Sequence, residues 1–255
     1  MADDLTSRFA VLAERADEAL PLDEAVLLVA AHALPGLDIG AELARLDDLA
    51  TGVGAPTVDA LRAHLVERLG FAGDLSTYHD ARNSLLPEVL DRRLGIPLTL
   101  AVVAMEVGRR SGVPLLGVGM PGHFLVRPQD DPGRFVDLFH GGAELDRAGC
   151  QAIFARLHPD AAWDDAFLSP VGPRAIVTRM LTNLISAYRR SGDRRALCWA
   201  LDLRLRLPGG TDRDRRELAV VLGAAGRYGE AASALEGTGR DRDHRAAARL
   251  RARLN

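Results

Sequence analysis

The chain contains no lysine, and all 32 of its basic residues are arginine. This absence excludes chemistry that needs a lysine amine, such as a Schiff base, an internal pyridoxal phosphate aldimine or the lysine of a phosphate-binding P-loop. Ala, Arg, Gly and Leu are abundant instead, which indicates a GC-rich coding bias rather than a functional choice. We expect no cofactor.

Cysteine is also scarce, and long hydrophobic runs are lacking. Cys150 and Cys198 are too few to form a disulfide framework, so we expect reduced thiols and a cytoplasmic protein. No apolar run approaches the ~20 residues that span a bilayer. The N-terminal segment lacks the basic and then apolar pattern of a secretory signal. We therefore expect no membrane partner.

The net charge of −3 hides an uneven division of charge along the chain. Residues 1–173 hold 14 Arg and 26 acidic residues, a net charge of −12, whereas residues 174–255 hold 18 Arg and 9 acidic residues, a net charge of +9. Such a split indicates two modules, and the basic one is expected to meet the acidic one or an acidic partner. Because its Arg alternate with Asp and aromatic residues are few, nucleic acid is not the expected partner.

Hydrophobic periodicity predicts an all-helical N-terminal region that covers a core. Asp23 and Thr57 stand where they could cap the second and the fourth helix. The four predicted helices span residues 3–20, 23–33, 38–50 and 57–69.

Residues 83–142 are predicted to form that core. A helix over 84–94 ends at Gly95, a residue typical of helix C-termini. Pro97 follows in the first turn of a second helix, where its missing N–H costs little. This second helix, 97–110, is apolar on nearly every face, which predicts a central, buried helix. Strands are expected over 115–120, 123–127 and 134–139, and another helix over 145–157.

The C-terminal part is helical and repetitive. Gly192 and Gly226 lie 34 residues apart, each between a long apolar helix and an Ala-rich one, which is typical of tetratricopeptide helix pairs. We therefore expect three segments: a domain over 1–157, a proline-rich linker over 158–173 and a repeat region over 174–255.

The core has the order of parts of a cysteine-type acyl-transfer site. Such a site places a thiol at a helix N-terminus, a His base near it and an Asp that orients the His. Here the helix begins at Pro97, and His123 and Asp137 stand on successive predicted strands. An unpaired carboxylate in an apolar strand is costly, so we expect Asp137 within hydrogen-bond reach of His123, ~2.6–3.2 Å.

This order closely resembles the transglutaminase-like superfamily, in which a Cys opens the central helix, a Gly-Ile-Pro-like turn follows about one helix later, and a strand His and a strand Asp come next. Here Gly112-Val113-Pro114 fits the turn. The resemblance narrows to the SirB1 family, which joins such a domain to a tetratricopeptide-like tail, and it covers roughly residues 20–255. The residues that carry it are Asn83-Ser84, Gly95-Ile96-Pro97, Pro121-Gly122-His123-Phe124, Phe135-Val136-Asp137, Gly141-Gly142, Arg179-Met180-Leu181, Asn183-Leu184 and Gly192-Asp193.

The resemblance implies an α+β fold, with a papain-like core of one central helix and a small antiparallel sheet, followed by an all-α tail. It also implies that Pro97 occupies the nucleophile position. Proline has neither a nucleophile nor a backbone N–H. One hypothesis is therefore a non-catalytic scaffold or regulatory protein whose tail binds a protein partner. The alternative is a hydrolase or acyl-transfer enzyme that uses His123 and Asp137 with water, Thr99 or Ser84.

Each candidate residue also has a structural interpretation. His123 could equally be a buried, hydrogen-bonded histidine, and the hydroxyls of Thr99 and Ser84 are more often capping groups. Asn83 and Gly122 are further candidates, on their place in the motifs. A metal site formed by His123, Asp137 and His140 is compatible in ligand type, but no H-x-x-x-H or C-x-x-C spacing supports it, so we expect no metal.

Overall fold

The computed structural model describes residues 2–253. The chain divides into two compact units, one of residues 15–180 and one of residues 1–14 together with 181–255. Helix α8 (Pro173–Ser191) runs from the first unit into the second. The division thus lies inside a helix and not in the linker predicted over 158–173. None of the described helices is both long and apolar enough to cross a lipid bilayer.

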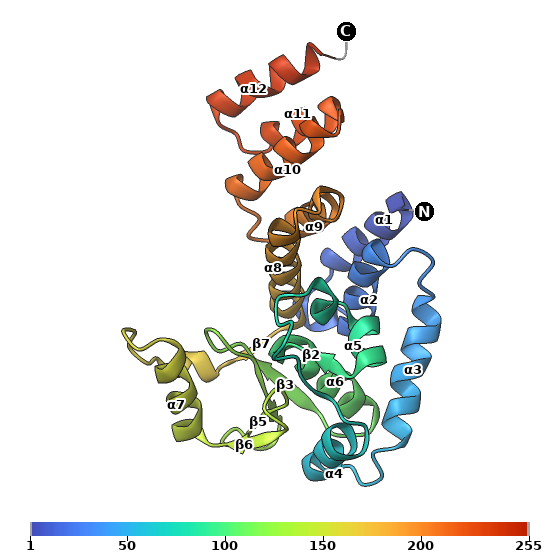
Figure 1. The fold of residues 1–255 in the computed structure, drawn as a ribbon, viewed down its shortest axis with the longest axis vertical. Helices are drawn as coiled ribbons and strands as arrows, with labels where there is room; N and C mark the ends of the chain where they lie inside the picture. Colours follow the sequence, from blue (N-terminus) through green and yellow to red (C-terminus); the bar gives the residue numbers. More distant parts are fainter. Residues whose placement is uncertain (1, 254–255) are drawn as a thin grey trace. The chain divides into compact units, whose positions relative to one another are not determined.

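The unit of residues 15–180 is built around α6 (Pro97–Arg110), as the apolar sequence of this helix predicts. Eleven of its 14 residues are buried. It packs between the sheet and four helices, three of which belong to the predicted N-terminal cover (Figure 1). These helices are α2 (Leu22–Ala33), α3 (Ile39–Thr51), α4 (Val58–Arg62) and α5 (Leu86–Arg92).

The sheet is antiparallel and has the strand order β6-β5-β4-β3-β7. Its strands are β3 (Leu115–Val118), β4 (Leu125–Pro128), β5 (Phe135–Asp137), β6 (Ala143–Leu145) and β7 (Pro170–Val171). Helix α7 (Arg147–Leu157) adds Cys150 and Phe154 to a buried cluster with Val118, Leu125 and Phe135 from the sheet side. The fold is therefore α+β, as predicted.

A short parallel ribbon that the sequence analysis missed leads into the central helix. Strand β1 (Ala72–Gly73) pairs with β2 (Leu94–Gly95), and Gly95 stands directly before the α6 N-cap, Ile96. The expected C-cap role of Gly95 is wrong. Arg93 ends α5 instead, in the left-handed conformation with φ = 57°.

Two predicted helices differ from the observed ones at the N-terminal side. The helix predicted over 3–20 is α1 (Ala2–Ala13) followed by a separate 3-10 turn (Asp17–Ala19), and α1 belongs to the other unit. The helix predicted over 57–69 is capped by Thr57 as expected, but α4 continues from Ala63 to Arg68 as a π-helix.

Asp23 does not cap α2, whose N-cap is Pro21. Its carboxylate instead accepts hydrogen bonds from Arg109 and Arg110 at the end of α6. The segment predicted as a linker, 158–173, is folded into the first unit, since it contains a 3-10 turn (Asp165–Leu168) and the edge strand β7.

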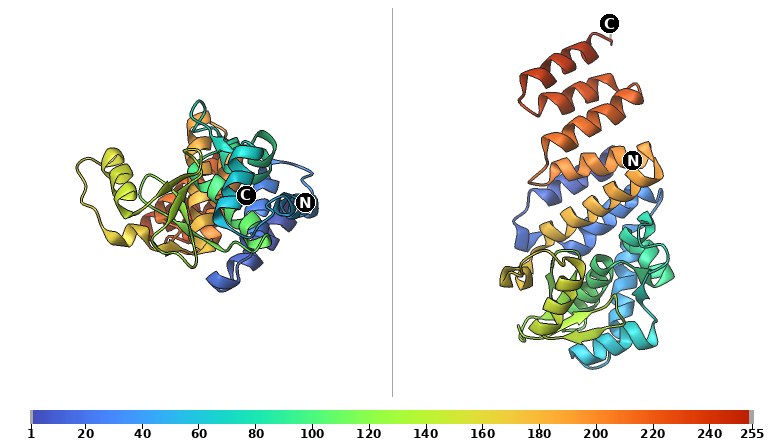
Figure 2. Two further views of the ribbon diagram at one scale, coloured as in Figure 1. Left: turned by 90° about the horizontal axis from the view of Figure 1, so that it is seen from below. Right: turned by 60° about the vertical axis from the view of Figure 1, so that its left-hand side comes forward.

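The second unit is all-helical. It contains α1, the end of α8, and α9 (Arg194–Arg206), α10 (Asp212–Ala224), α11 (Tyr228–Glu236) and α12 (Asp241–Arg251). Helices α9 to α12 pack one after another, as the right-hand view in Figure 2 shows. Gly192 and Gly226 both take a left-handed conformation, at φ = 73° and 76°, in the turns α8–α9 and α10–α11. The 34-residue spacing therefore marks two equivalent turns.

Candidate functional site

His123 and Asp137 face each other at one end of the sheet. Asp137 is the last residue of β5, and its Oδ2 lies 2.8 Å from Nε2 of His123. Both side chains are buried. The predicted pair is confirmed, although His123 stands in the turn before β4 rather than on the strand, with its N–H bonded to the carbonyl oxygen of Met120.

A second histidine, which sequence reasoning considered only as a metal ligand, shares the same carboxylate. Nδ1 of His140 lies 2.7 Å from Asp137 Oδ2, and Oδ1 accepts the backbone N–H groups of Phe139 and His140. Burial alone would raise the pKa of Asp137, but the hydrogen bonds and charges of His123 and His140 outweigh it and hold this pKa below its usual range. The carboxylate is thus ionised at neutral pH and fixed through both oxygens. The Asp-x-x-His spacing in the short turn after β5 is the sequence pattern that could have predicted the contact between Asp137 and His140.

Arg179 on α8 holds the turn that carries His123. Its guanidinium donates to the carbonyl oxygens of His123, at 2.9 Å, and Met120, at 3.3 Å, and lies 5.4 Å from the ring centre of Phe124. Burial lowers the pKa of Arg179. The sequence analysis used this residue only as part of a motif and did not predict its contact with the site.

Gly122 is required in the same turn for two reasons. Its φ of +74° lies in the left-handed region, and a Cβ placed there would stand 2.8 Å from Nε2 of His158. The shape of the turn before His123 therefore depends on a glycine.

Phe139 connects this turn region to the start of the central helix. Its ring centre lies 6.3 Å from that of His123. The Phe139 ring also lies against Gly73, where an added Cβ would come within 2.5 Å of it. Gly73 in turn pairs with Gly95 in the ribbon before α6. Pro97, buried at the first position of α6, follows two residues later.

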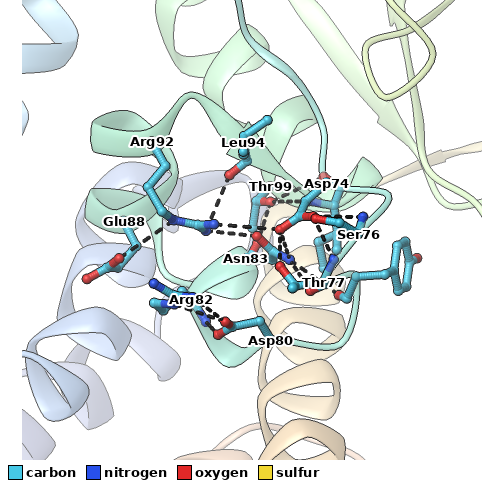
Figure 3. Close-up of polar contacts among 12 residues, drawn as sticks. Asp74, Ser76, Thr77, Asp80, Arg82, Asn83, Glu88, Arg92, Leu94 and Thr99 are labelled. Atoms are coloured by element: carbon cyan, nitrogen blue, oxygen red, sulfur yellow. Dashed lines mark hydrogen bonds and ion pairs between the residues drawn. The ribbon is translucent and has the colours of Figure 1, made fainter.

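Asn83 and Thr99 belong to a hydrogen-bonded network beneath the loop 74–83 (Figure 3). The Thr99 hydroxyl donates to the Asn83 carbonyl oxygen at 2.7 Å and accepts the Ile96 N–H at 3.2 Å. The Asn83 side chain donates to Asp74 and to the Thr77 carbonyl oxygen, and it accepts from Arg92. Both residues thus tie the loop to the start of α6.

Asp74 is the centre of that network. Its carboxylate accepts hydrogen bonds from the hydroxyl and backbone N–H groups of Ser76 and Thr77. The hydrogen bonds from Thr77 are the main reason why the pKa of Asp74 lies far below its usual range. Ser84, another candidate, is buried in the 3-10 turn that closes the loop. The sequence analysis missed Asp74.

Neither cysteine lies at the site. Cys150 is fully buried on α7, and burial raises the pKa of its thiol to about 11. Cys198 lies on α9, in the other unit, and burial raises its pKa as well.

A family model of the transglutaminase-like superfamily matches residues 12–182, a range that includes α2 to α7, the whole sheet and every residue of the site. The chain belongs to the transglutaminase-like superfamily. In this transglutaminase-like domain the central helix begins with Pro97, and His123 and Asp137 follow on the sheet side.

Several proteins are similar to this superfamily member. A UPF0162 protein of Xylella fastidiosa is 39% identical over 199 residues, which cover 71% of this chain and 70% of that protein. The UPF0162 protein of Pseudomonas aeruginosa is 37% identical over 188 residues, 70% of this chain and 68% of that one. F-box only protein 21 of Mus musculus is 32% identical over 144 residues, 53% of this chain and 22% of that protein. No solved structure matches the chain.

Proposed function

We propose that this protein is a non-catalytic transglutaminase-like protein of the SirB1 type, a scaffold or regulatory protein that binds a protein partner through its helical C-terminal unit. The observation that carries the proposal is Pro97 at the first position of α6. A thiol at a helix N-terminus is the nucleophile of a cysteine-type site, and proline supplies neither a thiol nor an N–H for an oxyanion.

The groups that could replace the thiol support the same proposal. The Thr99 hydroxyl already hydrogen-bonds Asn83 and Ile96, so a nucleophilic role would require breaking a buried network. Cys150, with a thiol pKa of about 11, is almost wholly protonated at neutral pH and sits in the core.

A groove in the second unit supports partner binding. It has a volume of about 640 Å³ and lies among α10, α11 and α12, with Val220, Tyr228 and Leu250 in its lining. Val220 is 71% exposed and adds apolar surface to the lining of this groove. Arg249 and Arg253 also line it, and the guanidinium of Arg253 lies 5.5 Å from the ring centre of Tyr228. A tetratricopeptide-like tail with this lining favours an acidic segment that also carries apolar side chains.

Cross-linking mass spectrometry on the full chain in cell extract tests this proposal. A specific partner should cross-link next to the groove, and Val220→Asp should abolish its capture, because a carboxylate there repels an acidic segment. Val11→Asp is the matched control, since Val11 is an exposed valine of α1 in the same unit. Equal capture by both variants would contradict the proposed surface.

The paired His123 and Asp137 favour a second candidate function, a hydrolase that activates water. Asp137 holds Nε2 of His123, which leaves Nδ1 as the atom that could take a proton from water. Hydrolysis of ester or amide substrates by the wild-type chain that is lost in His123→Ala and survives thiol alkylation would favour this function over the non-catalytic one.

A further inference from the structure

Three side chains from separate segments converge at the end of the sheet with the composition of a metal site. They are His123 before β4, Asp137 at the end of β5 and His140 in the next turn. Their ligand atoms, two ring nitrogens and a carboxylate oxygen, all lie within 4.8 Å of one another. Two imidazoles and one carboxylate are the protein ligands of many open zinc and iron sites.

The carboxylate is held as a metal ligand requires. Oδ1 of Asp137 is occupied by the backbone N–H groups of Phe139 and His140, so its orientation is set by the chain itself. Oδ2 is the oxygen directed at both histidines, 2.8 Å from His123 Nε2 and 2.7 Å from His140 Nδ1. Carboxylates that bind metals are commonly oriented in this way, with one oxygen held by hydrogen bonds and the other free to face the metal.

At the observed distances each histidine donates one N–H to the shared oxygen. Metal–ligand bonds of about 2.0–2.1 Å separate the ligand atoms of a tetrahedral site by about 3.3 Å. The two nitrogen–oxygen distances, 2.8 Å and 2.7 Å, would therefore have to lengthen by about 0.5 Å. His140 can make this movement, because its side chain is 43% exposed and stands on a turn.

We propose that His123, Asp137 and His140 bind one divalent transition-metal ion of the Zn²⁺ class, on the solvent side of the Asp137 carboxylate. Two nitrogen ligands favour Zn²⁺, Co²⁺ or Ni²⁺ over Mg²⁺ and Ca²⁺, which prefer all-oxygen sites. Of the three ligands, His140 is the one that water reaches, since its side chain is 43% exposed. The proposal goes beyond the partner-binding function, since it concerns the other unit.

Co²⁺ titration of the full chain, stripped with a chelator, tests this site by the visible absorption of the bound ion, with Zn²⁺ calorimetry for stoichiometry. The wild-type chain should bind one ion. His140→Ala should weaken binding by at least about tenfold, because it removes one of three protein ligands. His79→Ala is the control, since His79 is an exposed histidine of a neighbouring loop outside the cluster.

A second pair of variants separates this site from thiol binding. Asp137→Asn should also abolish the Co²⁺ spectrum, and circular dichroism establishes whether that variant is folded. Cys198→Ser should change nothing, because Cys198 lies in the other unit. Absence of Co²⁺ binding by the wild-type chain, equal binding by His140→Ala and His79→Ala, or loss of binding in Cys198→Ser would each overturn the proposal.

Discussion

Arg179 donates a 2.9 Å hydrogen bond to the backbone carbonyl oxygen of His123, 56 residues before it in the chain. A charged side chain on α8 thus fixes the backbone of the turn before β4. This turn directs the imidazole of His123 at Asp137. Hydrogen bonds that involve a charged group are worth about 1.5–3 kcal/mol each in net stability. The position of His123 therefore depends on a residue that hydrogen-bonds its main chain.

Replacing Arg179 by Met should loosen this turn. We expect a loss of roughly 2 kcal/mol in the free energy of unfolding, because two carbonyl oxygens lose a charged donor. The ¹⁵N resonances of the His123 ring should also shift, because the ring loses part of what fixes its orientation toward Asp137. Arg190→Met, which removes an exposed arginine of the same helix, should leave both measurements unchanged. An unshifted His123 resonance in Arg179→Met would show that Asp137 alone orients the ring.

Gly122→Ala should destabilise the same turn by a different route. The left-handed backbone costs about 1–2 kcal/mol for a residue with a Cβ, and the new methyl group would stand 2.8 Å from His158 Nε2. We expect urea denaturation to give a loss of roughly 2 kcal/mol. Gly133→Ala is the control, since its added Cβ makes only an ordinary contact.

The double variant Gly122→Ala/His158→Ala separates the two causes. It should recover the part of the loss that the steric contact produces and keep the part that the backbone produces. Full recovery would show that the left-handed conformation carries no cost at this position.

The sequence alone predicted those parts of the structure that depend on local residue patterns. The apolar residues on nearly every face of 97–110 predicted the buried helix, and the cost of an unpaired carboxylate predicted the contact between His123 and Asp137. The roles of Arg179 and Asp74 were missed, because each depends on contacts made only after distant segments meet. No local pattern distinguishes an arginine that binds a carbonyl oxygen from one that faces water.

Local patterns also misled where two signals competed. Gly95 looked like a helix end, but the left-handed Arg93 ends the helix and Gly95 is a strand residue that pairs with Gly73 of β1. The prolines of 158–173 suggested a linker, although a proline is also accepted at the edge of a sheet, where Pro170 stands.

The buried carboxylate of Asp74 should make stability depend on acid pH. Its pKa is lowered in the folded chain relative to about 3.9 in the unfolded chain. Its contribution is therefore fully present above the unfolded value and is lost as pH falls from there through the folded value. Asp74→Asn should be less stable than wild type at pH 7, and the difference should shrink as pH falls below about 4.

Chemical denaturation at a series of pH values measures this difference. Asp130→Asn, a change of an exposed aspartate, should follow the wild-type curve throughout. A constant difference between Asp74→Asn and wild type across the acid range would show that the loop depends on the shape of the side chain and not on its charge.

Pro97→Cys tests the proposal that a proline stands at the nucleophile position of this domain. The wild-type chain should show no thiol-dependent transglutaminase or protease activity, because Pro97 occupies the start of α6 and Cys150 is buried.

The Pro97→Cys substitution restores a thiol and a backbone N–H together. If His123 still faces this position, it should lower the pKa of the new thiol, so that iodoacetamide alkylates it at pH 7 faster than Cys150 or Cys198. Adding His123→Ala to the same chain should remove the acceleration, since no base would remain beside the thiol. A Pro97→Cys thiol that reacts no faster than free cysteine would mean that His123 and the start of α6 do not form one site. A wild-type chain that cleaves or cross-links peptides and loses this activity on alkylation would contradict the proposed non-catalytic function.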